Sequence, residues 1–245
     1  MSKLVAFYGS PGSGKTTIAL KTALTSYMTF NKGRIIFVSP DIVVPSVALL
    51  FPNYTPDDVH SLGDVIDKTD IGTDSILEKA ITIKGMPNLV CLGFKAGEGR
   101  YSFPAPTEGK ITGLFDSLSS IADLVIVDCS NDNDDMISKR ALETADIAFR
   151  VISADPKGLS WYASNKHSAR KEDSDLFNIV TAFEKDVFLA VEDVCKELNS
   201  LLAVMPYSKQ IRQQMIDGCL YNFCKDKAYN RKLNSIILKI SSAEE

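Results

Sequence analysis

The sequence is poor in the residues that most often carry nucleophilic, redox or metal chemistry. Of its 245 residues, only two are histidine, one is tryptophan and five are cysteine. The cysteines form no C-x-x-C pair and their number is odd. These counts argue against a disulfide framework or a zinc site and favour a reducing compartment.

Long apolar runs and a strong charge of one sign are also missing. No stretch approaches the roughly 18 uninterrupted apolar residues that a membrane-spanning helix needs, and the N-terminal segment has no small-residue cleavage site of a signal peptide. The net charge of −4 argues against a protein that binds polyanions over its whole surface. We predict a cytoplasmic protein with a single domain over residues 1–245, since 45% of the residues are hydrophobic and can form a core.

Short apolar runs recur along the chain and predict strands. They are continuous rather than alternating, which is typical of strands buried on both faces of a parallel sheet. The predicted strands are Leu4–Tyr8, Arg34–Ser39, Leu89–Gly93, Leu124–Asp128, Ile147–Ile152, Leu176–Ala182 and Leu201–Met205.

Helical patterns lie between these runs. They are Thr16–Met28, Val59–Ile66, Ile76–Thr82, Ile111–Ile121, Asp135–Thr144, Leu159–Ala169, Val187–Leu198 and Lys209–Asp217. Because strands and helices alternate from one end to the other, the predicted fold is α/β, a doubly wound and mostly parallel sheet flanked by helices. The loop Lys95–Lys110, with its glycines and prolines, is a candidate cover for a ligand.

The most specific motif is GSPGSGKTT at residues 9–17, directly after an apolar run. It fits G-x-x-x-x-G-K-[ST], a phosphate-binding loop, in the required context between a strand and a helix. Small residues let the backbone N–H groups turn inward on a phosphate, and the helix N-terminus adds a positive dipole end. The predicted nucleotide-binding residues of this loop are Gly9, Pro11, Gly12, Ser13, Gly14, Lys15, Thr16 and Thr17.

Individual roles follow from the chemistry of the side chains. Lys15 supplies a point charge to the β- and γ-phosphates, and the Thr16 hydroxyl is a ligand for Mg²⁺. Asp128 closes the apolar strand LVIVD, as does the acidic residue that holds the magnesium shell in phosphate-loop NTPases. Asp41 follows IIFVSP and is predicted to orient or activate a water, with a turn or helix-cap role as the alternative.

The order of these pieces resembles the ParA/MinD family of P-loop ATPases. The resemblance spans roughly residues 3 to 240 and includes the loop, LVIVDCS, ALETADIAFRVISADPKGLSW and LLAVMPYSKQIRQQMIDG. The small, atypical members of the TadZ/CpaE type, which localise pilus-assembly or secretion systems, look most similar. The resemblance implies a molecular switch that binds ATP and Mg²⁺, hydrolyses ATP slowly and positions plasmids, pili, secretion systems or division machinery.

The resemblance also implies a homodimer, exchange between ATP and ADP, and a partner protein in a localised assembly. Nonspecific DNA contact or a membrane surface is a further expectation. Residues 206–240 hold seven basic and two acidic residues, a balance of +5, which we interpret as a solvated helix face rather than a DNA-binding surface. The stripe of Tyr229, Leu233, Ile236, Ile237 and Ile240 is that of an amphipathic helix, which we interpret as a core helix rather than a membrane anchor.

The sequence departs from the family pattern at two places. Ser10 stands where members usually carry a lysine that reaches the partner's phosphates across the dimer, with Lys157 and Arg100 as candidate substitutes. Members often place an asparagine after the strand at Leu176–Ala182 to contact adenine, and this chain has TAFEKD there. We therefore expect the backbone around Pro206 and Tyr207 to line the base pocket.

Two alternatives remain open on the same phosphate loop. A small-molecule or nucleotide kinase would need an arginine-rich lid over its acceptor, and no arginine cluster is present in the loops. A scaffold that binds nucleotide without turnover is compatible with Ser10.

Overall fold

A computed structural model describes residues 2–30, 33–52, 60–132, 134–166, 175–182 and 189–242. Its strands are β1 (Lys3–Gly9), β2 (Ile35–Ser39), β3 (Ile81–Ile83), β4 (Met86–Gly93), β5 (Leu124–Asp128), β6 (Ile147–Ser153), β7 (Leu176–Thr181) and β8 (Leu201–Met205). They form one sheet in the order β3-β4-β2-β5-β1-β6-β7-β8, in which only the β3–β4 pair is antiparallel. The predicted fold class, a mostly parallel doubly wound sheet, is confirmed.

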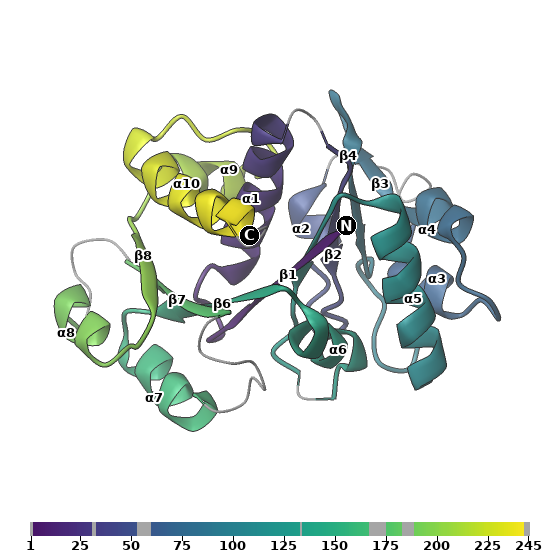
Figure 1. Cartoon of the computed structure of the whole chain (residues 1–245), viewed down its shortest axis with the longest axis horizontal. Helices are drawn as coiled ribbons and strands as arrows, with labels where there is room; N and C mark the ends of the chain where they lie inside the picture. The colour runs from purple at the N-terminus through teal and green to yellow at the C-terminus, as the bar shows by residue number, and fades with distance from the viewer. Residues whose placement is uncertain are drawn as a thin grey trace.

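Helices cover both faces of this sheet (Figure 1). They are α1 (Lys15–Thr29), α2 (Val47–Leu50), α3 (Leu62–Ile66), α4 (Thr73–Lys79), α5 (Glu108–Ile121), α6 (Met136–Thr144), α7 (Pro156–Asn165), α8 (Val191–Lys196), α9 (Lys209–Ile216) and α10 (Lys227–Ser242). Helix α1 packs against α10, and α10 also covers β8. The described part of the chain has no helix that is long and apolar enough to cross a membrane.

The alternation of side chains along β1 produces two cores. Val5 and Phe7 are fully buried on the face that α1 and α10 cover. Ala6 and Tyr8 are buried on the opposite face, with α5 and α6. A strand that is buried on both faces must be apolar at every position, which explains the continuous apolar runs in the sequence.

The amphipathic stripe of α10 belongs to the first of these cores. Tyr229, Leu233, Ile236 and Ile240 are buried in it, and Ile237 is buried as well. Leu238, on another side of the helix, is 69% exposed. The interpretation of this segment as a core helix is therefore confirmed.

All seven predicted strands are present, with ends that move by up to three residues. The helix predicted at Ile76–Thr82 is wrong at its end, because α4 stops at Lys79 and Ile81–Ile83 is the edge strand β3. Helix α2 and strand β3 were not predicted. The predicted helices Val59–Ile66, Leu159–Ala169 and Val187–Leu198 correspond to α3, α7 and α8, with their outermost residues outside the described ranges.

Gly9 marks the point where β1 comes closest to β6. A Cβ placed on Gly9 would lie 1.9 Å from the backbone oxygen of Val151, so no larger residue fits unless the strands separate. Gly113, inside α5, has an ordinary helical backbone, and a Cβ placed there would meet open space among the described residues.

We expect Gly9→Ala to lower the free energy of unfolding by at least about 2 kcal/mol, because the added carbon overpacks the β1–β6 contact. The matched change Gly113→Ala is expected to raise it by about 0.5–1 kcal/mol, since glycine is the poorer helix former. Urea unfolding followed by circular dichroism measures both. Equal effects of the two changes would contradict this account of Gly9.

Candidate functional site

The candidate site lies where the parallel strands end. One pocket of about 790 Å³ is lined from the loop after β1, the ends of β2 and β5, the ends of β7 and β8, and helices α9 and α10. In open parallel sheets ligands bind at this edge, outside the carboxyl ends of the strands. The pocket therefore has the place that the fold predicts for a ligand.

Most of the predicted site residues line this one pocket. They are Pro11, Gly12, Ser13, Gly14, Lys15, Thr16, Thr17, Asp41, Asp128, Pro206 and Tyr207. Gly9 is the exception, since it lies at the end of β1 and serves the close packing of β1 on β6. The fold thus brings predicted residues from four separate segments of the chain into one pocket.

The loop between β1 and α1 has the backbone that its glycines predict. Gly12 and Gly14 have φ values of 75° and 80°, in the left-handed region that side chains rarely adopt. A Cβ placed on either would have no atom of the described residues within 4 Å, so the space beside these two glycines is open. The Ser13 hydroxyl is buried and has no hydrogen-bond partner among these residues. An open loop of this kind at a helix N-terminus fits a phosphate group.

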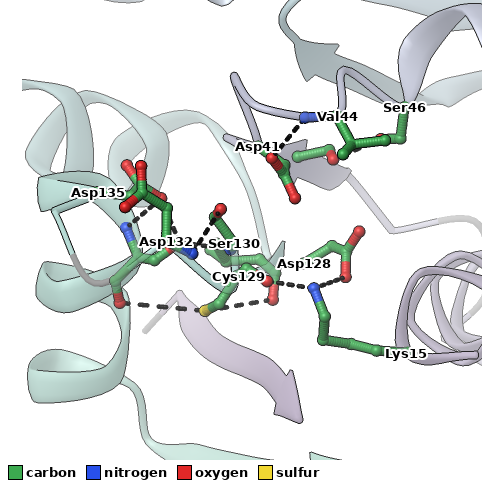
Figure 2. Close-up of polar contacts among 12 residues, drawn as sticks. Lys15, Asp41, Val44, Ser46, Asp128, Cys129, Ser130, Asp132 and Asp135 are labelled. Carbon is green, nitrogen blue, oxygen red and sulfur yellow. Dashed lines mark hydrogen bonds and ion pairs between the residues drawn. The ribbon is translucent and has the colours of Figure 1, made fainter. Parts of the chain in front are cut away.

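Lys15 is the charged centre of the pocket. Its side chain is only 7% exposed, and Nζ lies 3.0 Å from Asp128 Oδ1. Nζ also donates to the backbone carbonyl of Cys129, as Figure 2 shows. Burial raises the pKa of the Cys129 thiol to about 12, so the thiol stays protonated at neutral pH and only the carbonyl of this residue acts at the site.

Asp128 has the surroundings expected of a residue that supports a bound cation. It is 1% exposed at the end of β5, and the ion pair with Lys15 is the one polar contact that Oδ1 makes among the described residues. A buried carboxylate with a single such contact still has oxygen lone pairs free for a further ligand, and holding them out of water has a desolvation cost. Together with the nearby Thr16, it fits a magnesium ion whose remaining ligands are phosphate oxygens and waters.

Asp41 lies on the rim of the same pocket. Its Oδ1 accepts hydrogen bonds from the backbone N–H groups of Val43 and Val44, at 3.0 and 2.9 Å. The turn role that we considered as the alternative is therefore present. Asp41 also lines the pocket, and in the view of Figure 2 its other oxygen is directed toward Lys15 and Asp128. The two roles use different oxygens, and the catalytic role of Asp41 stays a prediction.

Ser10 belongs to the lining of the pocket, but its side chain is buried and bonded within the protein. It is 1% exposed, and its hydroxyl accepts a hydrogen bond from the backbone N–H of Ser153 at 3.2 Å. The two hydroxyls lie 3.3 Å apart. Ser10 thus joins the phosphate loop to the end of β6, a packing role that the sequence pattern did not indicate.

The two candidates for the missing cation lie elsewhere. Lys157 is exposed on α7, and Arg100 pairs with Asp132 at 2.6 Å and Asp134 at 3.6 Å. Neither lines the pocket, and the described residues of the loop Lys95–Lys110 do not line it either. The second cation in the described lining is Arg212, on α9, which donates to the Tyr207 hydroxyl at 3.0 Å.

An apolar wall on the far side of the pocket was not predicted. It consists of Ile211 and Met215 from α9, Leu220 from the following turn and Tyr229 from α10. Ile211 and Met215 are four residues apart on α9 and so share one face of the helix. This spacing, directly after Pro206 and Tyr207, was the available signal. We refer to Ile211, Met215, Leu220 and Tyr229 below as the apolar wall.

The fold is shared with solved structures of ParA and MinD proteins. A plasmid partition protein from Borrelia burgdorferi B31, bound to AMPPNP, superimposes with a TM-score of 0.73 at 17% identity over 100% of both chains. A ParA family ATPase from Chlorobium tepidum gives a TM-score of 0.67 at 15% identity over 100% of this chain and 98% of that one. Septum site-determining protein MinD from Pyrococcus horikoshii, complexed with Mg-ADP, gives 0.67 at 18% identity over 98% and 96%.

No protein-family model and no curated protein matches the sequence. The structural comparisons, in contrast, confirm the resemblance to ParA/MinD ATPases at the level of the fold. The finer likeness to TadZ/CpaE proteins stays a prediction.

Replacing Ser10 by the lysine of the family pattern is expected to destabilise the protein. Ser10→Lys would bury an ammonium beside Ser153 without a counter-charge, which costs about 2 kcal/mol or more of unfolding free energy. Ser10→Ala, which only removes the hydrogen bond, is expected to cost about 1 kcal/mol. Thermal and urea unfolding measure the difference. A Ser10→Lys variant as stable as the parent would show that this side chain can leave its buried position.

A second test concerns Asp135, which begins α6 and accepts hydrogen bonds from the N–H groups of Ile137 and Ser138. Through Ser138, whose hydroxyl accepts from Ser130 N–H at 2.7 Å, it supports the segment that holds Lys15. Burial raises the pKa of Asp135 to about 6, against about 4 in an unfolded chain. The folded state therefore binds the extra proton between these values, and this residue's contribution makes stability fall as pH rises from 4 to 6.

Asp135→Asn keeps a side-chain oxygen for the cap and removes the titration. We expect the slope of unfolding free energy against pH to become more positive in this variant between pH 4 and 6. Summed over this window, the unfolding free energies of variant and parent should diverge by at most about 3 kcal/mol. Urea titrations at half-unit pH steps measure it. The exposed Asp134→Asn is the control, and an identical pH profile in both variants would contradict the assignment.

Proposed function

We propose that this chain binds ATP with Mg²⁺ and acts as a slowly hydrolysing molecular switch of the ParA/MinD type. The observation that carries the proposal is the Lys15–Asp128 pair at the mouth of an open glycine loop, within one large pocket. The AMPPNP and Mg-ADP bound to two proteins of the same fold support a nucleotide as the ligand.

Each residue has a role in this proposal. Gly12, Ser13 and Gly14 hold the phosphates with main-chain N–H groups, and Lys15 leaves Asp128 to neutralise the β- and γ-phosphates. Thr16 and Asp128 would hold Mg²⁺, which supplies charge neutralisation and alignment of the phosphates. Asp41 orients the attacking water.

The biological output that we propose is the positioning of other machinery. The switch would dimerise, bind a partner protein of a localised assembly, and act in the cytoplasm, at the membrane surface or at the nucleoid. The small TadZ/CpaE-type members are the best guide to such a protein, because they also depart from the common family pattern.

A scaffold that binds nucleotide without turnover is the second candidate. The buried position of Ser10 favours it, since a side chain that supports β6 does not serve a partner's phosphates. Any partner cation in a dimer would have to come from another residue.

Lys15→Ala is expected to weaken Mg-ATP binding by at least about a hundredfold, because one charged contact to phosphate is lost from a desolvated site. The exposed Lys157→Ala is the control and should bind as the parent does. Titration calorimetry with Mg-ATP measures both affinities. Unchanged binding by Lys15→Ala would contradict the proposed site.

Phosphate release then separates the candidate functions. A switch hydrolyses ATP slowly and responds to DNA or liposomes, whereas a scaffold binds ATP and releases no phosphate under any condition. A kinase would release product only when its acceptor is added. The switch is contradicted if ATP binds but no turnover occurs with either surface present.

A further inference from the structure

Helix α1 carries a second buried lysine beyond the one that faces the phosphates. Lys21 is 1% exposed, and its three N–H donors each have an acceptor. Nζ donates to Gln214 Oε1 at 2.7 Å, to the Leu220 carbonyl at 2.6 Å and to the Asn222 carbonyl at 2.6 Å. All three acceptors are neutral, which is an unusual setting for a buried charge.

These acceptors belong to the apolar wall of the pocket or adjoin it. Leu220 is part of the wall, and Gln214 precedes Met215 on α9. Gln214 also donates from Nε2 to the Phe223 carbonyl at 3.1 Å, so it ties the same turn from the other side. Through Lys21, α1 is therefore hydrogen-bonded both to α9 and to the turn that follows it.

We propose that Lys21 is a positioning residue for nucleoside recognition, which sets the apolar wall at a fixed distance from the phosphate loop. The first turn of α1 holds the phosphates and the next turns hold the wall, so one rigid helix determines how far apart the two halves of a nucleotide bind. A wall that is already in place adds affinity because little order is lost on binding. The inference rests on the proposed function, that the pocket binds ATP.

The electrostatic setting provides a readout besides affinity. Burial lowers the pKa of Lys21 to about 8, and the thiols of Cys224 and Cys219 oppose this lowering. From α9 it faces the uncharged Gln214. From α10 the nearby titratable group is Tyr229, whose pKa burial raises, so it stays neutral. No described carboxylate forms an ion pair with Lys21.

Above pH 8 the amine loses a proton, and one of its three acceptors loses its donor. We therefore expect nucleoside affinity to fall as pH rises through 8. The unfolding free energy should change with pH in the opposite direction. Between pH 8 and about 10.4 the unfolded chain binds more protons at this residue than the folded one, so the unfolding free energy rises with pH. A general loosening of the protein would lower both together.

The test compares Mg-ATP with magnesium tripolyphosphate, which has the phosphates but no nucleoside. By calorimetry at pH 7, Lys21→Met should weaken ATP binding by about tenfold or more and tripolyphosphate binding by less than about twofold. Lys209→Met, an exposed lysine on α9, is the matched control and should leave both affinities unchanged. Circular dichroism verifies that each variant is folded.

Gln214→Glu gives a test that does not depend on the stability of Lys21→Met. A carboxylate beside the ammonium favours its charged form. The pH at which ATP affinity falls should then move upward by about one unit, while tripolyphosphate affinity shows no such step.

Equal losses for both ligands in Lys21→Met, or no loss for ATP, would overturn the positioning role. An unchanged pH midpoint in Gln214→Glu would also overturn it. Parent protein that binds neither ligand would refute the proposed function itself, which is a distinct result.

Discussion

The contact between the Lys15 ammonium and Asp128 joins the start of α1, the helix that follows β1, to the end of β5. β1 and β5 are neighbours in the sheet but far apart in the sequence. The contact forms only because β1 and β5 run parallel in register, with Phe7 opposite Asp128. The loop after β1 therefore begins at the level where β5 ends. Glycines at positions 12 and 14 then let the chain reverse within a few residues, and Lys15 enters the first turn of α1 facing the carboxylate. Parallel pairing thus determines where the charges of the pocket lie.

Burial strengthens the attraction between Lys15 and Asp128. Lys15 and Asp128 are both almost inaccessible, so their attraction acts in a medium of low dielectric, and neither charge can be removed without leaving the other unpaired. A polyphosphate that competes for Lys15 must offer more negative charge than the single carboxylate. It also releases Asp128, whose Oδ1 contacts no other polar group of the described residues than Lys15. The same step therefore frees a cation for phosphate and an anion for a metal.

The parts of the fold that were predictable are those in which local pattern and global position agree. β1, β2 and β5 are apolar runs that are buried almost throughout, as their pattern predicts. The loop at residues 9–17 carries a motif that requires a strand before it and a helix after it. Strand β3 was not predicted, because no turn residue separates it from the helical pattern before it. Ile81 and Ile83 do have the spacing of a strand. Its strand conformation depends on pairing with β4, a tertiary contact.

The candidate site divides in the same way. The phosphate side is encoded by contiguous residues, whereas the apolar wall requires α9 and the turn after it to pack back on α1. No sequence pattern indicates that Lys21, on the first helix of the chain, contacts Leu220. Ser10 is similar, since its partner Ser153 is supplied by β6. Features built by contacts between distant segments are invisible to periodicity and spacing.

The charges around the pocket limit how it can hold a nucleoside triphosphate. The charged residues in its described lining are Lys15, Arg212, Asp41 and Asp128, which sum to zero. Side-chain charge alone thus offers no net attraction for a triphosphate. The net attraction for phosphate must come from the oriented N–H groups of the glycine loop and from the positive end of α1. Under the proposed function, a metal ion that pairs with Asp128 would neutralise one of the two carboxylates that repel the phosphates. Replacement of Asp128, the carboxylate that pairs with Lys15, should therefore change the affinity for the magnesium complex more than the affinity for the free nucleotide.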